Sequence, residues 1–401
     1  MRIALLSHEY PPETGYGGIG TYTFHQARGL AALGHDVTVF CGSAKPAPAL
    51  VTREAGVRIV RLQTALPAGW ERSFDRDRLG WTRGRMRNGL AMWQGLEELS
   101  RRHAFDLLEA PECGAEAWLI AAQRQWPVVI RFHSPAELIM PYYHATEQDR
   151  MLSAYFERLG VLGAASYTAC SEFMSREATQ KYHLAQPAMV IHNGLDLDWF
   201  DNAAPAPVRE RTNIPRGNTL IFFGARLERR KGADLLAEIM LPILERYPVS
   251  FVVAGADNNE GILCELQRCL GRSRVGTFHY LGRLGLDDVR SWLHAASICL
   301  IPSRWENCPY SCLEAMAART AIVAFRVGGL PELVSDQVTG LLAEPNDVPA
   351  FRRAVCRLVE DPRLAERFGR AGRSRIEQRF TVRQMAERSM QIYRETANAA
   401  P

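Results

Sequence analysis

The chain has 401 residues, of which 47% are apolar and 23% charged, and its net charge is +4 at pH 7. This length exceeds one ordinary hydrophobic core and fits two domains of about 200 residues each. The mild charge does not indicate a nucleic-acid-binding protein, so we expect no nucleic-acid partner. No apolar run approaches the length of about 18 residues that a membrane-spanning helix requires, so we expect no span.

The cysteines and the first residues bear on the cellular compartment. Nine cysteines are scattered without a CxxC pair, and no histidine stands at ligand spacing to Cys308 and Cys312. We interpret them as packing thiols and expect no metal site. The apolar run before Ser7 is short and is followed by His8, Glu9 and two prolines, which indicates a strand rather than a signal peptide. We therefore expect a cytoplasmic protein.

The first half of the chain alternates strand and helix patterns. Such alternation is typical of a parallel sheet covered by helices on both faces. A helix is expected at residues 21–33 and a longer one at 147–165. The expected strands are residues 2–7, 36–41, 57–62, 106–110, 128–132 and 167–169.

A glycine-rich loop precedes the first expected helix. Gly15, Gly17 and Gly20 match G-x-G-x-x-G, but residues 8–14 separate them from the strand, and the next strand ends without a ribose-binding acid. Both points exclude a dinucleotide fingerprint. Gly17 and Gly18 have two remaining interpretations. Their N–H groups could approach an anion at the helix N-terminus, or the glycines could serve a structural turn.

His133 follows the expected strand at 128–132. The carboxyl ends of parallel strands are where open α/β sheets bind ligands, so His133 is a candidate ligand contact. A satisfied structural histidine is the alternative.

The segment Trp70 to Trp93 contains six arginines against three acids, interleaved with aromatic residues. It could be an amphipathic surface that contacts anionic lipid, or a solvated helix and loop. Asp75 and Asp77 inside it, like Asp196 and Asp198 later, match D-x-D. Neither pair follows a convincing buried strand, so we do not interpret them as a metal site.

The second half begins a new α/β series. Residues 201–218 are rich in Ala, Pro and Asn without periodicity, which indicates a linker between an N-terminal domain at 1–200 and a second domain at 219–381. The expected strands of the second domain are residues 219–223, 249–254, 278–281, 297–301 and 321–324.

Two cations bracket the loop after the first of these strands. Arg226 and Lys231 lie between the strand end and a helix start. A guanidinium binds phosphate oxygens in pairs and an ammonium adds a mobile charge, so the loop is a candidate phosphate site. We expect the flanking Arg229 and Arg230 to be solvated. A coincidental basic loop is the alternative.

The stretch from Ile301 to Ala317 reads as a strand end, a loop and a helix, and it carries Glu306 and Glu314. Eight residues of helix rise about 12 Å, whereas a retaining glycosidase places its two carboxylates only about 5.5 Å apart. The pair is therefore not a glycosidase pair, and each glutamate would bind a different part of one long ligand. Two solvated glutamates are the alternative.

This E-x7-E pattern after P-S-x-x resembles the retaining glycosyltransferases of family four. The Gly-Gly loop, the Arg226 to Lys231 pattern and the N-G-x-D sequence at 193–196 resemble the same family. The resemblance implies an α/β protein of GT-B fold, with two Rossmann-like domains facing a central cleft. It also implies that the last helix, within residues 382–401, crosses back to the first domain.

The resemblance further implies roles for individual residues. The second domain would bind the donor nucleotide sugar and the first would face the acceptor. Glu306 and His133 would contact the transferred sugar at the reaction centre, and Glu314 would hold the ribose. The donor diphosphate would be bound by Gly17, Gly18, Arg226, Lys231 and the backbone at Asn307, and the base would be contacted near Leu284. Residues 307–309 differ from the Gly-Phe sequence that is common at this place in the family. The hydroxyl of the donor sugar that this loop would recognise is therefore left open.

The implied activity is retaining, metal-independent transfer of a hexosyl unit from a nucleoside diphosphate sugar to a hydroxyl acceptor. A UDP-sugar is favoured and GDP-mannose is the second candidate. The acceptor could be a glycan, a lipid-linked sugar or a small molecule, with peripheral contact at the inner membrane face through Trp70 to Trp93. No cofactor is expected. A non-catalytic nucleotide-sugar-binding module and a GT-B epimerase remain as rival interpretations.

Overall fold

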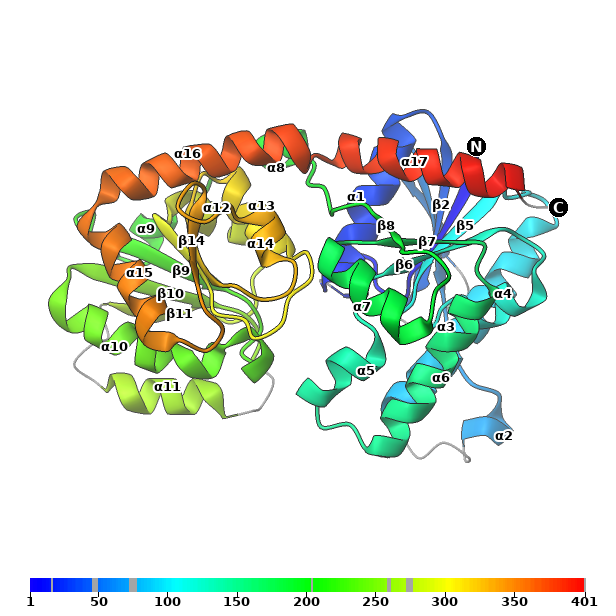
Figure 1. Cartoon of the computed structure of the whole chain (residues 1–401), viewed down its shortest axis with the longest axis horizontal. Coiled ribbons are helices and arrows are strands. Elements are labelled where there is room, and N and C mark those ends of the chain that lie inside the picture. Colours follow the sequence, from blue (N-terminus) through cyan, green and yellow to red (C-terminus); the bar gives the residue numbers. More distant parts are fainter. Residues whose placement is uncertain are drawn as a thin grey trace. The chain divides into compact units, whose positions relative to one another are not determined.

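The computed structural model describes residues 1–15, 17–44, 50–71, 78–202, 205–257, 261–271 and 277–399. The chain forms two compact units, Met1–Gly194 together with Val382–Pro401, and Leu195–Thr381. Each unit is a sheet of mostly or entirely parallel strands with helices packed on it (Figure 1). The predicted α/β fold with two Rossmann-like domains is confirmed.

The sheet of the first unit has the order β3-β4-β2-β1-β5-β6-β7-β8. Its central strand β1 pairs in parallel with β2 and β5, and Ile3, Ala4 and Leu6 on it are fully buried. Helices on both faces explain why these strands read as continuous apolar runs. The strands are β1 (Arg2–Leu6), β2 (Asp36–Gly42), β3 (Leu50–Glu54), β4 (Val57–Leu62), β5 (Leu107–Pro111), β6 (Val128–Phe132), β7 (Ser166–Ala169) and β8 (Met189–Val190).

The strand β3 was not predicted. It pairs antiparallel with β4, and all its residues are exposed, so no buried face gives it an alternating apolar pattern. The connecting residues Ala55 and Gly56 have φ of 47° and 81°. Positive φ at both positions is the two-residue turn that matches the twist of a hairpin.

Helix α17 belongs to the first unit and packs along α1 (Figure 1). The approach is close at Gly29, where a Cβ atom would lie 2.9 Å from Val382 and 3.0 Å from Ala386. The predicted return of the last helix to the first domain is confirmed. The helices of this unit are α1 (Gly18–Ala32), α2 (Ala68–Glu71), α3 (Gly80–Ser100), α4 (Trp118–Gln123), α5 (Ala136–Ile139), η1 (Met140–Tyr142), α6 (Glu147–Gly163), α7 (Glu172–Tyr182) and α17 (Val382–Ala399).

The sheet of the second unit has the order β11-β10-β9-β12-β13-β14 and is parallel throughout. Strand β14 was not predicted. Gly340 pairs with Ile322, and a Cβ atom there would lie 2.7 Å from the Ile322 carbonyl oxygen. The strands are β9 (Thr219–Gly224), β10 (Val249–Ala254), β11 (Phe278–Tyr280), β12 (Ile298–Ile301), β13 (Ala321–Phe325) and β14 (Gly340–Ala343).

The helices of the second unit lie between and after these strands. They are α8 (Leu197–Asp201), α9 (Val208–Arg211), η2 (Arg229–Lys231), η3 (Ala233–Leu235), α10 (Leu236–Arg246), α11 (Ile262–Leu270), α12 (Leu286–Ala295), α13 (Tyr310–Ala317), α14 (Leu330–Leu333), α15 (Val348–Glu360) and α16 (Pro362–Arg379).

The predicted linker at 201–218 lies within the second unit, whose boundary falls between Gly194 and Leu195. The backbone N–H of Ala206 donates to Ser291 on α12 at 3.0 Å, and α9 follows. A four-residue helix among prolines has no periodic signal, so the sequence could not reveal it.

Asp196 of the D-x-D match caps α8 by accepting from the Trp199 N–H at 3.0 Å.

The segment Trp70 to Trp93 is largely α3, and Phe74, Asp75 and Asp77 lie outside the described residues. Met86 is buried, and buried Arg85 pairs with buried Glu157 at 2.6 Å. Part of the basic run therefore faces the core rather than solvent or lipid. In the described residues, no helix is both long and apolar enough to cross a bilayer.

Candidate active site

The loop after β9 carries the two predicted phosphate-binding cations. Arg226 keeps 47% of its side chain exposed, whereas Lys231 keeps 17%. Lys231 ends the short helix η2 and is followed by Gly232 with φ +70°. A Cβ atom at Gly232 would lie 1.8 Å from the Pro302 carbonyl oxygen. The glycine therefore lets this loop approach the loop that follows β12.

Glu306 lies in the loop between β12 and α13 and is buried. Its Oε1 accepts from the Lys231 ammonium at 2.5 Å and from the Ser303 hydroxyl at 2.9 Å. Its backbone oxygen accepts from the Gly329 N–H at 3.1 Å. Burial alone would raise the pKa of Glu306, but the charges of Lys231 and Arg230 and the two hydrogen bonds hold it below its usual value. Glu306 is therefore a fixed, ionised carboxylate at neutral pH.

The two loops are bonded to each other at a second point. The guanidinium of Arg304 forms two bonds to the Asp234 carboxylate, at 2.7 and 2.9 Å, and a third to the backbone oxygen of Arg229. Arg229 is exposed, as predicted, but Arg230 is buried and pairs with buried Glu228 at 2.6 Å. The prediction that Arg230 is solvated was wrong, because the Arg230 guanidinium pairs with the buried Glu228 carboxylate instead of with water.

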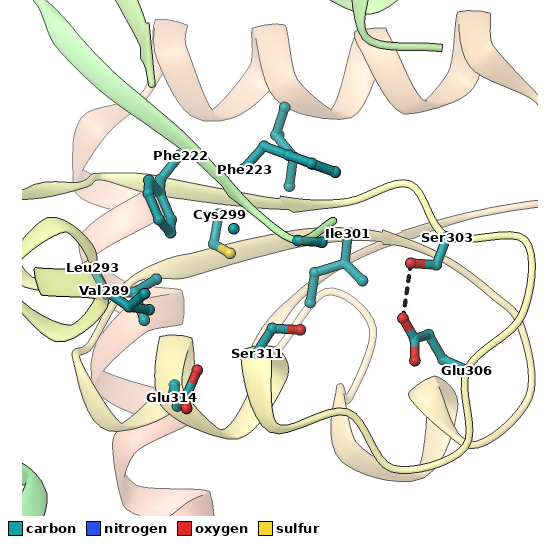
Figure 2. Close-up of a pocket in the computed structure, with 13 residues that line it drawn as sticks. Phe222, Phe223, Val289, Leu293, Cys299, Ile301, Ser303, Glu306, Ser311 and Glu314 are labelled. Atoms are coloured by element: carbon teal, nitrogen blue, oxygen red, sulfur yellow. Dashed lines mark hydrogen bonds between the residues drawn. The ribbon is translucent and has the colours of Figure 1, made fainter. Parts of the chain in front are cut away.

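Both predicted glutamates line one hollow in the second unit (Figure 2). Its non-atom space is about 350 Å³, open solvent included. In Figure 2 Ser311 lies between Glu306 and Glu314. Burial raises the pKa of Glu314 to about 7. The lining residues are Phe222, Phe223, Gly224, Ala225, Val289, Leu293, Cys299, Leu300, Ile301, Ser303, Glu306, Ser311 and Glu314.

Two further predicted contacts belong to this unit. Asn307 is buried directly after Glu306. Leu284 lies half-buried in the loop between β11 and α12 and is not among the residues that line the hollow. The structure therefore brings Glu306 and Lys231 into contact and places Glu314 in the same hollow, with Leu284 apart from it.

His133 follows β6 in the first unit and is buried. Burial, with a smaller effect of Arg131, lowers the pKa of His133 well below its usual value, so the ring is neutral at pH 7. The ring lies against Tyr22 of α1, with centroids 4.9 Å apart. Its backbone N–H donates to the Glu112 carboxylate at 2.8 and 2.9 Å. A carboxylate from the end of β5 thus fixes this residue.

Gly17 is the N-cap of α1, and Gly18 is its first residue. The Glu9 carboxylate lies at this helix end: a Cβ atom on Gly17 would be 2.5 Å from Glu9 Oε2, and the Gly20 N–H donates to the same oxygen at 3.4 Å. At Gly18 a Cβ atom would meet no atom of the described residues within 4 Å, apart from its chain neighbours. A carboxyl group of the protein itself therefore already lies where the loop was predicted to approach an anion.

The residues that sequence reasoning missed are mostly acids that orient the predicted ones. Glu228 stands between the two predicted cations, and an acid inside a basic run is the signal that could have identified it. Ser303 is part of the P-S-x-x pattern and two positions after the strand end. Glu9 and Glu112 each follow an expected strand, at the edge where parallel sheets place their ligand-binding groups.

The family is decided by comparison with known proteins. Models described as "Glycosyltransferase Family 4" and "Glycosyl transferases group 1" match residues 16–199 and 217–361. The chain belongs to glycosyltransferase family four. The family predicted from the motifs is confirmed, and this glycosyltransferase is matched by relatives along nearly its whole length.

Two relatives come from Mycobacterium tuberculosis. An alpha-maltose-1-phosphate synthase is 30% identical over 98% of this chain and 99% of its own length. A glycogen synthase is 31% identical over 98% of this chain and 94% of its own. Among solved structures, the sucrose-phosphate synthase of Thermosynechococcus elongatus covers 100% of both chains, with TM-score 0.80 and 22% identity. These likenesses confirm the GT-B fold of this glycosyltransferase.

Proposed function

We propose that this glycosyltransferase moves a hexosyl unit from a nucleoside diphosphate sugar to a hydroxyl acceptor, with retention at the anomeric carbon and without a metal ion or another cofactor. The observation that supports it best is the hollow lined by both Glu306 and Glu314, with Lys231 bonded to Glu306 at 2.5 Å. One long ligand with a sugar at one end and a ribose at the other would engage both glutamates.

The transfer requires a diphosphate to leave as the anomeric carbon gains positive character. Lys231 has three N–H donors and can hold Glu306 and a phosphate oxygen together. Arg226 is exposed enough to add a second cation, and a hydrogen bond to a charged group contributes about 1.5 to 3 kcal/mol. These cations, with the backbone N–H groups at Asn307, would stabilise the leaving charge without a metal.

The remaining roles follow from the chemistry of each group. Glu306, ionised and fixed, would orient the transferred sugar through a hydroxyl. Glu314 would accept hydrogen bonds from the ribose, and Leu284 would lie near the base. In the first unit, neutral His133 would contact the sugar by a hydrogen bond rather than a charge. Gly17 and Gly18 would donate N–H groups to the diphosphate, which would displace the Glu9 carboxyl group from that helix end.

The new glycosidic bond would form on the face of the anomeric carbon from which the diphosphate departs, and the hydroxyl proton would leave with the diphosphate. We favour a UDP-sugar as donor, with GDP-mannose as the alternative. The acceptor would be a hydroxyl of a glycan, a lipid-linked sugar or a small molecule. We further propose a cytoplasmic enzyme that contacts the inner membrane face through Trp70 to Trp93.

The test is a thermal-shift and donor-hydrolysis screen of the purified protein against UDP-, GDP- and ADP-sugars, with and without EDTA. Stabilisation and slow hydrolysis with one donor, unchanged by EDTA, would support the proposal, and NMR of the released or transferred sugar would report retention. Binding without hydrolysis or transfer would favour a non-catalytic module. Conversion of the bound sugar to its epimer would favour an epimerase.

A further inference from the structure

Glu228 lies between the two proposed phosphate-binding cations and keeps 1% of its side chain exposed. Its Oε1 accepts from Arg230 at 2.6 Å, and its Oε2 lies 3.4 Å from Arg226 Nη1. The two arginines differ in environment, since the Arg230 side chain is 7% exposed and that of Arg226 is 47% exposed. Arg230 therefore neutralises Glu228 inside the protein, while the second oxygen of Glu228 lies within ion-pair distance of a terminal nitrogen of the half-exposed Arg226 guanidinium.

The backbone of the same turn keeps these groups together. The Glu228 N–H donates to the Arg226 carbonyl at 2.9 Å, and the Glu228 carbonyl accepts from the Lys231 N–H at 3.0 Å. Both proposed cations are thus bonded through the main chain to the residue whose side chain contacts Arg226.

Arg230 extends this arrangement to the loop of Glu306. Its guanidinium donates to the Trp305 carbonyl at 3.5 Å, and its own carbonyl accepts from the Arg304 N–H at 2.8 Å. The charge of Arg230 also helps to keep Glu306 ionised. A buried ion pair therefore connects the cation loop with the two residues that precede Glu306, the proposed sugar contact.

We propose that Glu228 is a positioning residue: it fixes the Arg226 guanidinium for the diphosphate of the donor, and Arg230 anchors Glu228 and joins it to the Glu306 loop. This inference rests on the proposed function of Arg226 as a diphosphate ligand. A carboxylate is otherwise an unfavourable neighbour for a diphosphate, because the two are negatively charged.

That repulsion makes the sign of the effect diagnostic. If Glu228 served folding alone, Glu228→Gln would leave nucleotide binding unchanged or tighten it by removing a negative charge. If Glu228 positions Arg226, the same variant would weaken binding, because a long side chain released from its partner must be ordered again when the ligand binds.

The experiment is a double-mutant cycle in the full-length protein, with UDP, GDP and ADP as probes and calorimetry as the readout. We expect Arg226→Ala to weaken binding of the preferred nucleotide about 10- to 100-fold, and Glu228→Gln about 5- to 20-fold. In the Arg226→Ala background, Glu228→Gln should change affinity by less than about twofold, since its effect passes through Arg226. Asp201→Asn is the matched control, because it breaks an arginine pair of the same unit, Arg373 to Asp201 at 2.6 Å, away from these loops.

The outcomes separate this inference from the proposed function. Two outcomes overturn the inference alone, provided that Arg226→Ala weakens nucleotide binding. In the first, Glu228→Gln leaves nucleotide affinity unchanged or raises it. In the second, Glu228→Gln changes affinity equally in the wild-type and Arg226→Ala backgrounds. A wild-type protein that binds none of the three nucleotides, or an Arg226→Ala that binds as wild type does, overturns the diphosphate role and the inference with it. Should Glu228→Gln not fold, Glu228→Asp keeps the negative charge but shortens the side chain by one methylene group, and the same cycle applies with a smaller expected loss.

Discussion

Glu306 and Glu314 are glutamates eight positions apart in the sequence, and the protein shifts their pKa values in opposite directions. The pKa of Glu306 is lowered in spite of burial, because Lys231 and Arg230 stabilise its charge. The pKa of Glu314 is raised to about 7, because burial acts there without a compensating cation. At neutral pH one carboxylate is fully ionised and the other titrates, which fits different roles on one ligand.

Substitution of each glutamate should therefore affect a different kinetic quantity. Glu306→Ala should lower kcat at least about 100-fold, the size of effect that loss of one transition-state contact produces. Glu314→Ala should weaken UDP binding about 10-fold or more, since hydroxyl partners are lost, with a smaller effect on kcat. Steady-state kinetics and calorimetry measure both. Two variants with near wild-type kcat and nucleotide affinity would contradict the assigned roles.

Nucleotide affinity should depend on pH through Glu314. The ionised carboxylate is the stronger hydrogen-bond acceptor, so affinity for UDP should rise as pH increases from 6 through the pKa of about 7 and then level off. Glu314→Gln should lose this rise while keeping the titration of the phosphate itself, so the difference between the two calorimetric profiles reports Glu314. Parallel profiles for wild type and variant would show that the carboxylate does not bind the nucleotide.

At the scale of the elements, the site of the second unit depends on two loops that come into close contact at Gly232. The loops after β9 and β12 are held by the ion pairs of Lys231 and Arg304 and by the approach of Gly232 to Pro302. Strands that are neighbours in the sheet, here β9 and β12, place their carboxyl ends side by side. The sheet order thus decides which loops can share a site.

Gly232→Ala tests this approach. An alanine at positive φ costs about 1 to 2 kcal/mol by itself, and here its Cβ atom would also lie 1.8 Å from a carbonyl oxygen. We expect a loss of stability of about 3 kcal/mol or more, measured by denaturant unfolding, with loss of Lys231-dependent activity.

Gly261→Ala is the matched control for that variant. Gly261 has a similar φ of +73°, but within the described residues no atom lies within 4 Å of a Cβ position there. The variant should therefore lose only the conformational term of about 1 to 2 kcal/mol. Equal losses in the two variants would show that the loops can separate without cost.

At the scale of the whole molecule, the chain end completes the first unit. Tyr393 on α17 is buried, donates to Glu109 of β5 at 2.5 Å and accepts from Gln26 of α1 at 3.1 Å. Nearer the end of the same helix, Thr396 is within 2.7 Å of Ser166 of β7. Residues at the far end of the chain therefore supply polar partners that the first unit needs in its core.

Removal of the Tyr393 hydroxyl should destabilise the first unit. Tyr393→Phe leaves the buried Glu109 carboxylate with one fewer donor, and an unsatisfied buried group costs about 1 to 3 kcal/mol. Hydrogen exchange of α1, β5 and α17 would locate the loss within the unit. Tyr155→Phe, at a residue that is 57% exposed, should have little effect. Similar values for both variants would show that α17 is held by apolar packing alone.

The expectations from the sequence succeeded where a signal repeats along one element. Helices α6, α13 and α17 and most strands lie within a few residues of their predicted positions, because burial of one face leaves a periodic pattern. The expectations failed at β3, whose residues are all exposed, and at α9, where prolines and a single turn of helix leave no period. Both elements form because of contacts with other parts of the chain: β3 pairs with β4, and the segment before α9 is bonded to Ser291 of α12.

The sequence by itself determined the two α/β units, the family and the positions of the candidate site residues, because each is carried by local periodicity or by residues at short, fixed spacing. Tertiary structure alone decided that Arg230 is buried on Glu228, that Glu9 lies at the N-terminus of α1, and that Glu306 and Glu314 differ in acidity. The physical reason is that burial and ion pairing depend on distances in space between elements, and a local pattern contains no information on the partner that another strand will bring.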